Sequence, residues 1–293
     1  MDGENEASSF CLDCQEPRNY NEINQPKLTF GSRGIENGQL LLPYGITTDS
    51  IGNILVCDLK NRVQIFNSEG NFISTFGSKG NENGQFNFPC GIAINSKGNI
   101  VVSGNLNHRI QIFDSEGKFI STFGSKGKRN GQLMNPKGIC IDKNDNIYVC
   151  DSKNHRIQKF DSEGKFISTF GSKGKGNCRF DFPFGISINS SGNIIVSDYG
   201  NNRIQVFNSK GDFISKFGER GNGNNQFNGP HGICVDLNDN ILVCDSINNR
   251  IQVFDSDGKY ITQFKVNQPT AIKIDPKTQN VIICGHDNKI SIY

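Results

Sequence analysis

A short proline step recurs along this chain at a nearly constant interval. The sequence reads Pro-x-Gly-Ile five times at spacings of 46 or 47 residues, and a shorter interval of 39 residues leads to a sixth step at Pro269. A fixed period of this length indicates an array of supersecondary units, none of which buries its apolar surface alone. The six units are marked by Pro43, Pro89, Pro136, Pro183, Pro230 and Pro269.

Each unit contains four short runs rich in β-branched and aromatic residues. In the third unit they cover residues 138–142, 146–150, 156–160 and 166–170. Such runs, bounded by turn residues, are typical of β-strands. Tight turns join the first run to the second and the third to the fourth, while longer loops make the other connections. We therefore expect antiparallel four-stranded meanders, each with a short-turn face and a long-loop face.

The last unit is one strand short, and the start of the chain supplies a matching run. Residues 289–293 fit its third strand, and residues 27–31 read as the missing fourth. Meanders arranged radially form a β-propeller, which leaves only short, protected edges. We predict an all-β, six-bladed β-propeller over residues 27–293, with the ring closed by the N-terminal strand completing blade six. We expect a complete ring, preceded by a flexible acidic tail over residues 1–26.

Composition favours a cytoplasmic protein without a membrane segment. No apolar run is long enough to span a bilayer, and the first 26 residues lack the apolar region of a secretory signal. Five of the ten cysteines fall at strand positions where other units carry Ser or Ala, so we expect buried free thiols in a reducing compartment. Cys11 and Cys14 have zinc-knuckle spacing but no second pair to complete a tetrahedral site. We predict neither a metal nor another cofactor.

The recurring string closely resembles the NHL repeat. It is seen in full as Pro136-Lys137-Gly138-Ile139 followed by residues 151–158, and all six units fit it. The chain has no Trp, which argues against WD repeats. The resemblance implies a propeller that serves as a platform for proteins or RNA. Many relatives add a RING, a B-box and a coiled coil and act as ubiquitin ligases, so it also implies a target-recognition or adaptor role, with a ubiquitin ligase or its target as partner.

Two periodic features are predicted to be scaffold. Asp151 and Arg156 recur as a pair in three other units, which suggests a charge-assisted clasp. Gly104 and Gly285 replace the aspartate in the second and sixth units. The phenylalanines just before the prolines are expected to be wedges between blades, and they are Phe86, Phe88, Phe180, Phe182 and Phe227.

Charge differs between the two faces. On the long-loop face basic side chains outnumber acidic ones two to one, and the ratio is reversed on the short-turn face. Basic groups around an exposed Phe184 ring suit single-stranded RNA, and the same field suits an acidic protein segment. A surface selected for solubility would also look like this. The predicted binding residues are Lys126, Lys128, Arg129, Lys137, Lys153, His155, Lys173, Lys175, Arg179 and Phe184, with Tyr44 and His231 at the mouth of the central channel.

A catalytic alternative depends on two histidines. His231 and His286 lie in neighbouring units and could hold a metal with Cys284 or Asp287, as a lyase or hydrolase propeller would require. His155 falls at a repeated Asn-His-Arg position and is expected to serve the scaffold as well. No P-loop, nucleophile elbow or catalytic carboxylate pair is found. We therefore predict a non-catalytic binding protein.

Overall fold

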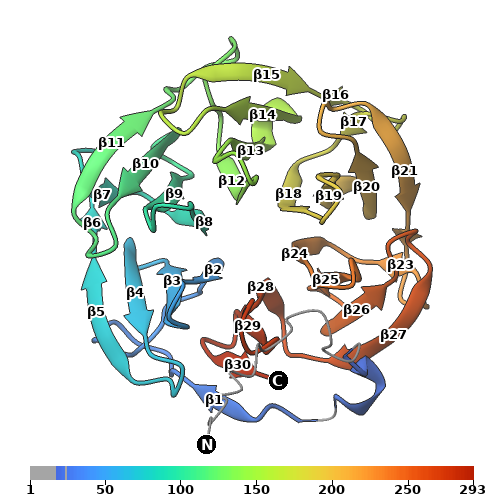
Figure 1. The fold of residues 1–293 in the computed structure, drawn as a ribbon, viewed down its shortest axis with the longest axis horizontal. Helices are drawn as coiled ribbons and strands as arrows, with labels where there is room; N and C mark the ends of the chain where they lie inside the picture. The colour runs from blue at the N-terminus through green and yellow to red at the C-terminus, as the bar shows by residue number, and fades with distance from the viewer. Residues whose placement is uncertain (1–17, 24) are drawn as a thin grey trace, which may run out of the picture.

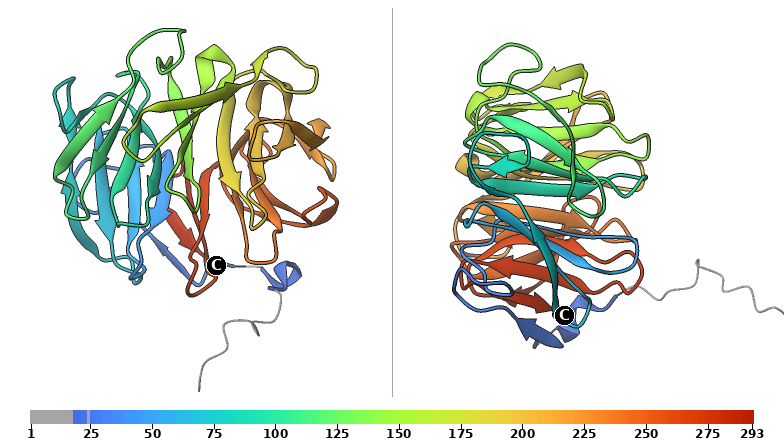
Figure 2. Two further views of the ribbon diagram at one scale, coloured as in Figure 1. Left: turned by 45° about the horizontal axis from the view of Figure 1, so that its top comes forward. Right: turned by 90° about the vertical axis from the view of Figure 1, so that its left-hand side faces the viewer.

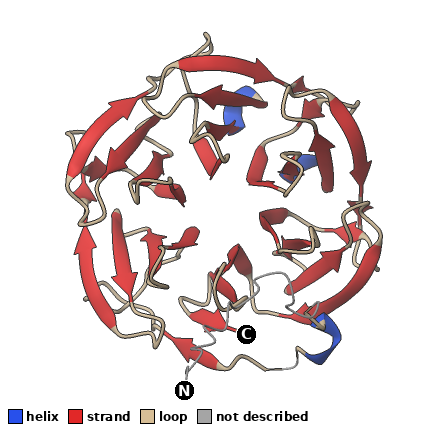
Figure 3. Cartoon of the chain, viewed as in Figure 1, coloured by secondary structure: helices blue, strands red, loops and turns tan. Residues whose placement is uncertain are grey.

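Six four-stranded antiparallel sheets stand around a central channel in the computed structural model, which describes residues 18–23 and 25–293 (Figure 1). Strands dominate, and the helical turns η2 (Tyr20–Glu22), η3 (Ser152–Asn154) and η4 (Tyr199–Asn201) are short (Figure 3). In the edge-on view of Figure 2 the strands run between two loop-bearing faces. This architecture confirms the predicted six-bladed propeller.

The blades are named from the inner strand outward. Blade 1 has β2 (Gly45–Thr48), β3 (Ile54–Asp58), β4 (Arg62–Phe66) and β5 (Phe72–Phe76). Blade 2 has β8 (Pro89–Ile94), β9 (Ile100–Gly104), β10 (Arg109–Phe113) and β11 (Phe119–Phe123). Blade 3 has β12 (Pro136–Ile141), β13 (Ile147–Asp151), β14 (Arg156–Phe160) and β15 (Phe166–Phe170).

The second half of the ring repeats this plan. Blade 4 has β18 (Pro183–Ile188), β19 (Ile194–Asp198), β20 (Arg203–Phe207) and β21 (Phe213–Phe217). Blade 5 has β24 (Pro230–Val235), β25 (Ile241–Asp245), β26 (Arg250–Phe254) and β27 (Tyr260–Lys265). Blade 6 has β28 (Pro269–Ile274), β29 (Val281–Gly285), β30 (Ile290–Ile292) and β1 (Leu28–Phe30). Short parallel pairs in three long loops are β6 (Ser78–Lys79) with β7 (Gln85–Phe86), β16 (Ser172–Lys173) with β17 (Arg179–Phe180), and β22 (Glu219–Arg220) with β23 (Gln226–Phe227).

The first and last strands of the described chain close the ring. β1 pairs antiparallel with β30, with Leu28 opposite Ile292 and Phe30 opposite Ile290. The two strands lie side by side in Figure 1. The strand pairing predicted from residues 27–31 is therefore confirmed.

Apolar clusters between neighbouring blades form the core. Phe86, Phe180 and Phe227 are fully buried there, as predicted for wedges. The prediction was wrong for Phe182, whose side chain is 42% exposed. Phe182 precedes a proline and has a φ of 52°, and this left-handed conformation turns its ring away from the core.

The glycine of each proline step allows the inner strands to approach one another. A Cβ atom on Gly91 would overlap the carbonyl oxygen of Lys137, and one on Gly138 would overlap that of Phe184. The sixth step departs from the pattern with Ala271 in place of glycine. A side chain at most of these positions would therefore push two blades apart.

A hydrogen bond that we call the inter-blade latch joins each blade to the next. The residue before each proline has a φ between 41° and 66°, and its N–H donates to an Asn or His side chain of the preceding blade. Phe182 donates to His155 Nδ1 over 3.2 Å, and Gly229 donates to Asn202 Oδ1 over 2.9 Å. The other four latches run from Leu42 to Asn288, Phe88 to Asn61, Asn135 to His108 and Gln268 to Asn249.

The predicted Asp–Arg clasp is confirmed in four blades. Asp151 is fully buried, and Arg156 Nε donates to its Oδ2 over 2.7 Å. The same guanidinium donates to the carbonyls of Arg129 and Gln132, so the clasp holds the loop that precedes the blade. Burial raises the pKa of Asp151, and hydrogen bonds from Asn154 and Arg156 oppose that rise. The other clasps are Asp58 with Arg62, Asp198 with Arg203 and Asp245 with Arg250.

In blade 2 a neighbouring side chain takes part of the missing aspartate's role. Asn107 Oδ1 accepts the N–H of Asn87, a bond that aspartates make in blades 3 to 5. A Cβ on Gly104 would contact this Asn107 side chain. Arg109 Nε is left buried without a partner.

The packed body extends beyond the predicted boundary at residue 27. Tyr20 is 4% exposed, lies in the core cluster between blades 5 and 6, and donates its hydroxyl hydrogen to Asp236 Oδ2 over 2.8 Å. Apolar burial of this ring fixes η2 against β27. Cys11 and Cys14 lie outside the described residues.

Eight cysteines of the described chain are free thiols, and none is exposed. Cys57, Cys150, Cys244 and Cys284 are fully buried on central strands, as expected of small core residues. Among residues 18–23 and 25–293 no helix is long and apolar enough to cross a membrane.

The latch leads to a prediction for His155. Replacing His155 with Ala removes the acceptor of the Phe182 N–H, and we expect a loss of about 1–3 kcal/mol in the free energy of unfolding. His155→Asn should recover most of this loss, because Asn is the acceptor in four of the six latches. Urea unfolding of the two variants measures the difference, and equal losses in both would contradict the latch.

Candidate binding surface

Seven of the predicted basic residues lie exposed on the long-loop face of blades 3 and 4. They come from the loop before β12, the loop before β18 and the turn after β13. The loop before β18 is shaped by the parallel pairing of Ser172 with Arg179, and the loop before β12 by a bridge from Lys126 to Leu133. We call this set the basic rim, and it comprises Lys126, Lys128, Arg129, Lys153, Lys173, Lys175 and Arg179.

Two loops of the basic rim share a hollow. Lys128 and Lys153 line a cavity of about 210 Å³ together with Asn154, His155 and Arg156. Asn154 donates to the carbonyl of Gly127 over 2.8 Å, which ties the two loops together. Two lysines from different loops are therefore held beside one opening, an arrangement that favours an anionic group.

His155 serves the scaffold more than the surface. Its side chain is largely buried, and Nδ1 accepts the latch bond from Phe182. Burial lowers its pKa, and Asp181, whose Oδ1 lies 3.5 Å from Nδ1, opposes that shift. The ring packs against the Phe182 ring at a centroid distance of 4.7 Å. The exposed aromatic ring beside the basic rim is consequently that of Phe182.

Phe184 is buried, contrary to the expectation of an exposed ring. Only 5% of it is accessible, because it projects from the inner strand β18 into the crowded channel mouth. Lys137 Nζ lies 4.0 Å from the centroid of the Phe184 ring. The His231 ring stacks on the Phe184 ring with a centroid distance of 4.2 Å and an interplanar angle of 5°. Burial also lowers the pKa of Lys137. These three predicted residues contact one another at the channel mouth, apart from the basic rim.

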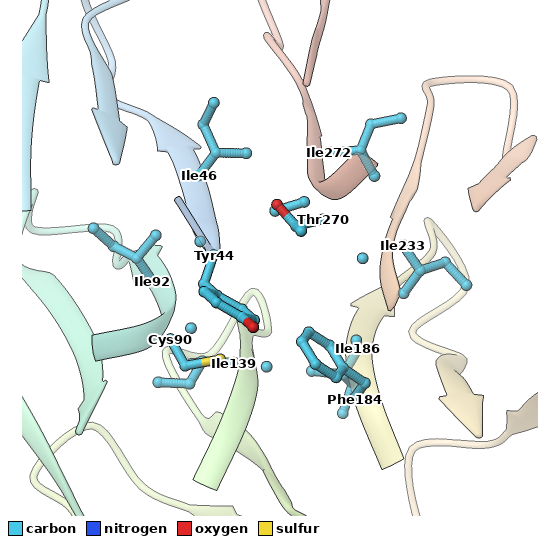
Figure 4. A pocket seen from close by; sticks show the side chains of 16 residues that line it. Tyr44, Ile46, Cys90, Ile92, Ile139, Phe184, Ile186, Ile233, Thr270 and Ile272 are labelled. Atoms are coloured by element: carbon cyan, nitrogen blue, oxygen red, sulfur yellow. The ribbon is translucent and has the colours of Figure 1, made fainter. Parts of the chain in front are cut away.

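Tyr44 completes this channel-mouth cluster from blade 1. Its ring lies 4.7 Å from that of Phe88, 5.2 Å from that of His286 and 6.3 Å from that of Phe184. Figure 4 shows Tyr44 and Phe184 at the channel, with the isoleucines of the inner strands around them. A cavity of only about 70 Å³ remains. The cluster is defined here as Tyr44, Phe88, Lys137, Phe184, Tyr199, His231 and His286.

The two histidines of the catalytic alternative do approach each other. Their ring centroids are 6.4 Å apart, and His231 Nδ1 and His286 Nε2 are buried without hydrogen-bond partners. Burial lowers the pKa of His231 to about 3, and Lys137 and His286 add to the effect. The described residues contain no group of three or more His, Cys, Asp or Glu side chains placed to hold a metal ion.

Comparison with known proteins agrees with the repeat and the fold. The family described as NHL repeat matches residues 86–113 and 133–160, and one described as 6-bladed beta-propeller matches residues 185–270. Protein lin-41 of Caenorhabditis elegans is 48% identical over 66 residues, which are 22% of this chain and 6% of that protein. E3 ubiquitin-protein ligase TRIM71 of Gallus gallus is 40% identical over 68 residues, 23% of this chain and 8% of that protein. These alignments span less than a tenth of either relative.

Solved structures share the architecture at low sequence identity. A gluconolactonase from Xanthomonas campestris superposes with a TM-score of 0.68 and 17% identity, covering 88% of both chains. A streptogramin B lyase superposes with a TM-score of 0.65 and 18% identity, covering 91% of this chain and 86% of its own. The class defined by the fold is the six-bladed β-propeller. Within that class the chain carries NHL repeats at residues 86–113 and 133–160, and it is similar to segments of lin-41 and TRIM71.

The buried His231 makes stability depend on pH. Its pKa is lowered to about 3 in the folded protein, below the usual value near 6.5 for an unfolded chain. The stability due to the neutral ring is therefore present above about pH 6.5 and is lost as pH falls toward 3. The unmodified protein and the variant His231→Phe are both expected to lose free energy of unfolding when the pH falls from about 7.5 to about 4.5. In His231→Phe, which keeps a ring on Phe184, this loss should be smaller than in the unmodified protein by on the order of 2 kcal/mol. Urea unfolding at both pH values tests this, and equal losses would contradict it.

Proposed function

We propose that this propeller is a non-catalytic binding platform whose basic rim holds single-stranded RNA. The observation that carries the proposal is the gathering of seven exposed cationic side chains from three loops of neighbouring blades. RNA phosphates pair with Lys and Arg, and unstacked bases stack on aromatic rings. The half-exposed ring of Phe182, next to the hollow that Lys128 and Lys153 line, supplies such a ring.

The same positive field would attract an acidic protein segment. The two kinds of partner differ in their need for stacking, since a run of carboxylates gains little from an aromatic face. Phe182 therefore separates them. Loss of its ring should weaken RNA binding and leave binding of an acidic peptide almost unchanged.

We propose binding rather than catalysis because the side chains of the channel-mouth cluster pack on one another and leave little room for a substrate. Lys137 and His231 both contact the Phe184 ring, and the remaining cavity is small. A metal-dependent lyase or hydrolase site at His231 and His286 is the alternative. Metal analysis of the purified protein and melting in the presence of Zn²⁺, Mn²⁺ or Mg²⁺ test it, and tight binding lost in His231→Phe would favour that alternative.

A second candidate role is target recognition in a ubiquitin-ligase pathway, in the reducing cytoplasm. The similarity of 68 residues to a protein named an E3 ubiquitin-protein ligase favours it, and buried free thiols are compatible with that compartment. We expect the chain alone to transfer no ubiquitin, and to bind a ligase or its target. Reconstituted ubiquitination with and without the chain measures this.

Reversing charge on the basic rim should strongly weaken RNA binding. In a variant with Lys128, Lys153, Lys173 and Lys175 all changed to Glu, we expect the Kd for a fluorescent single-stranded RNA to rise at least tenfold at low salt. Phe182→Ala should weaken RNA binding roughly 5- to 100-fold, the range for loss of one stacked base. Fluorescence anisotropy at several salt concentrations gives these values.

The short-turn face provides a matched control. Lys97, Lys118, Lys165 and Lys210 are exposed there, and their change to Glu alters net charge by the same amount. This variant should bind RNA nearly as well as the unmodified protein. Equal weakening by both charge reversals, or affinity independent of salt, would contradict an RNA site on the basic rim.

A further inference from the structure

An apolar groove opens between blades 1 and 2 toward the short-turn face. The basic rim lies on the opposite face of the propeller. The groove has a volume of about 360 Å³, and no basic residue lines it. Ile73 at its edge is 49% exposed. The groove, here called the open groove, is lined by Leu55, Ile65, Ile73, Ile94 and Ile100, with Asp49 and Glu116 at its polar end.

The equivalent groove between blades 5 and 6 is already filled by a tyrosine. Tyr20 belongs there to one buried cluster with Leu242, Val253 and Ile274, which occupy the positions of Leu55, Ile65 and Ile94 in their repeats. Its hydroxyl donates to Asp236, the counterpart of Asp49. The Arg18 guanidinium lies 5.8 Å from the centre of the Tyr20 ring and donates to the carbonyl of Gln279.

The third groove of this kind, between blades 3 and 4, is filled from within. Tyr148 stands at the position of Leu55, and its hydroxyl donates to Asp142 Oδ2 over 3.3 Å. Lys159 stands at the position of Ile65, with its Nζ 3.5 Å from the same carboxylate. Four repeats carry an aspartate at this position, Asp49, Asp142, Asp236 and Asp275, and two of the four bond a tyrosine hydroxyl.

Asp49 is arranged as Asp236 is, apart from the tyrosine. Asp49 Oδ1 accepts two backbone N–H groups, and Oδ2 accepts the side-chain amide of Asn53 over 2.8 Å. Asp236 makes the same bonds with the backbone and with Asn240, and its Oδ2 takes the Tyr20 hydroxyl in addition. No hydroxyl of the described chain bonds to Asp49. One acceptor position at the end of an apolar groove is thus ready for a phenol.

We propose that the open groove binds a tyrosine from a segment of a partner protein that carries a basic residue shortly before that tyrosine. A tyrosine fits because its ring would take, in the open groove, the place that Tyr20 and Tyr148 take in the other two grooves. Its hydroxyl would then donate to Asp49. A basic residue shortly before the tyrosine fits because Arg18 precedes Tyr20 in this way, and because Asp49 and Glu116 make the polar end acidic. None of these residues belongs to the basic rim, so the proposal does not depend on RNA binding.

The direct probe is a synthetic peptide with the sequence of residues 17–23, Pro-Arg-Asn-Tyr-Asn-Glu-Ile. It is titrated to about 1 mM into full-length protein with labelled isoleucine and leucine methyl groups, since such short segments bind weakly. We expect shifts at Leu55, Ile65 and Ile73, and none at Ile214, which has the strand position and exposure of Ile73 on blade 4. A peptide with Phe for Tyr should bind roughly three- to tenfold more weakly.

Two sets of variants locate the site. Leu55→Tyr with Ile65→Lys installs the pair that fills the groove between blades 3 and 4, and should abolish the shifts without lowering the melting temperature much. Ile73→Lys should weaken binding, whereas Ile214→Lys should not. Both positions are exposed, so we expect little effect of either change on folding.

Several results would overturn the proposal. They are the absence of shifts at about 1 mM peptide, equal binding of the Phe peptide, and shifts confined to blades 5 and 6. Peptide binding that survives the double change Leu55→Tyr with Ile65→Lys would also overturn the proposal. Dimerisation of the protein alone that Ile73→Lys abolishes would instead make the groove a contact between copies.

Discussion

The ring depends on one hydrogen bond repeated at every blade boundary. The N–H of the residue before each proline donates to an Asn or His of the preceding blade, and the six bonds include one from Leu42 to Asn288 across the closure. Because donor and acceptor residues both have left-handed backbone, each bond fixes the long loop on one side and the strand turn on the other. The basic rim and the channel-mouth cluster take their positions from these fixed loops.

On the short-turn face, two kinds of contact alternate between successive blade boundaries. Between blades 2 and 3 the Asp145 carboxylate accepts the N–H and hydroxyl of Ser96, and between blades 4 and 5 Asp239 does the same with Ser190. The boundaries between blades 3 and 4 and between blades 5 and 6 carry the aspartates bonded to tyrosines, and the boundary between blades 1 and 2 carries Asp49 at the open groove. A propeller of nearly identical repeats therefore presents two different faces, one basic and formed by loops, the other acidic and grooved.

Much of the fold could be predicted from the sequence, because the period, the strand runs and the residues of the clasp recur in register. The exposure of individual rings could not. Phe182 and Phe184 flank Pro183. Phe182 has a left-handed backbone conformation that turns its ring outward, whereas the ring of Phe184 enters the channel. Tyr20 lies in a polar, acidic segment, so only the structure shows that it fills an apolar groove. His155 has the chemistry of a surface ligand, and its role in the latch depends on a residue 27 positions away.

Native-state hydrogen exchange of the six latch amides tests this account most directly. The amides of Leu42, Phe88, Asn135, Phe182, Gly229 and Gln268 are each predicted to exchange only through global unfolding, with one common free energy, while amides of the exposed loops exchange far faster. Fast exchange at any latch, above all at Leu42 where the ring closes, would show that the blades part there without unfolding and would contradict the central role of the latch.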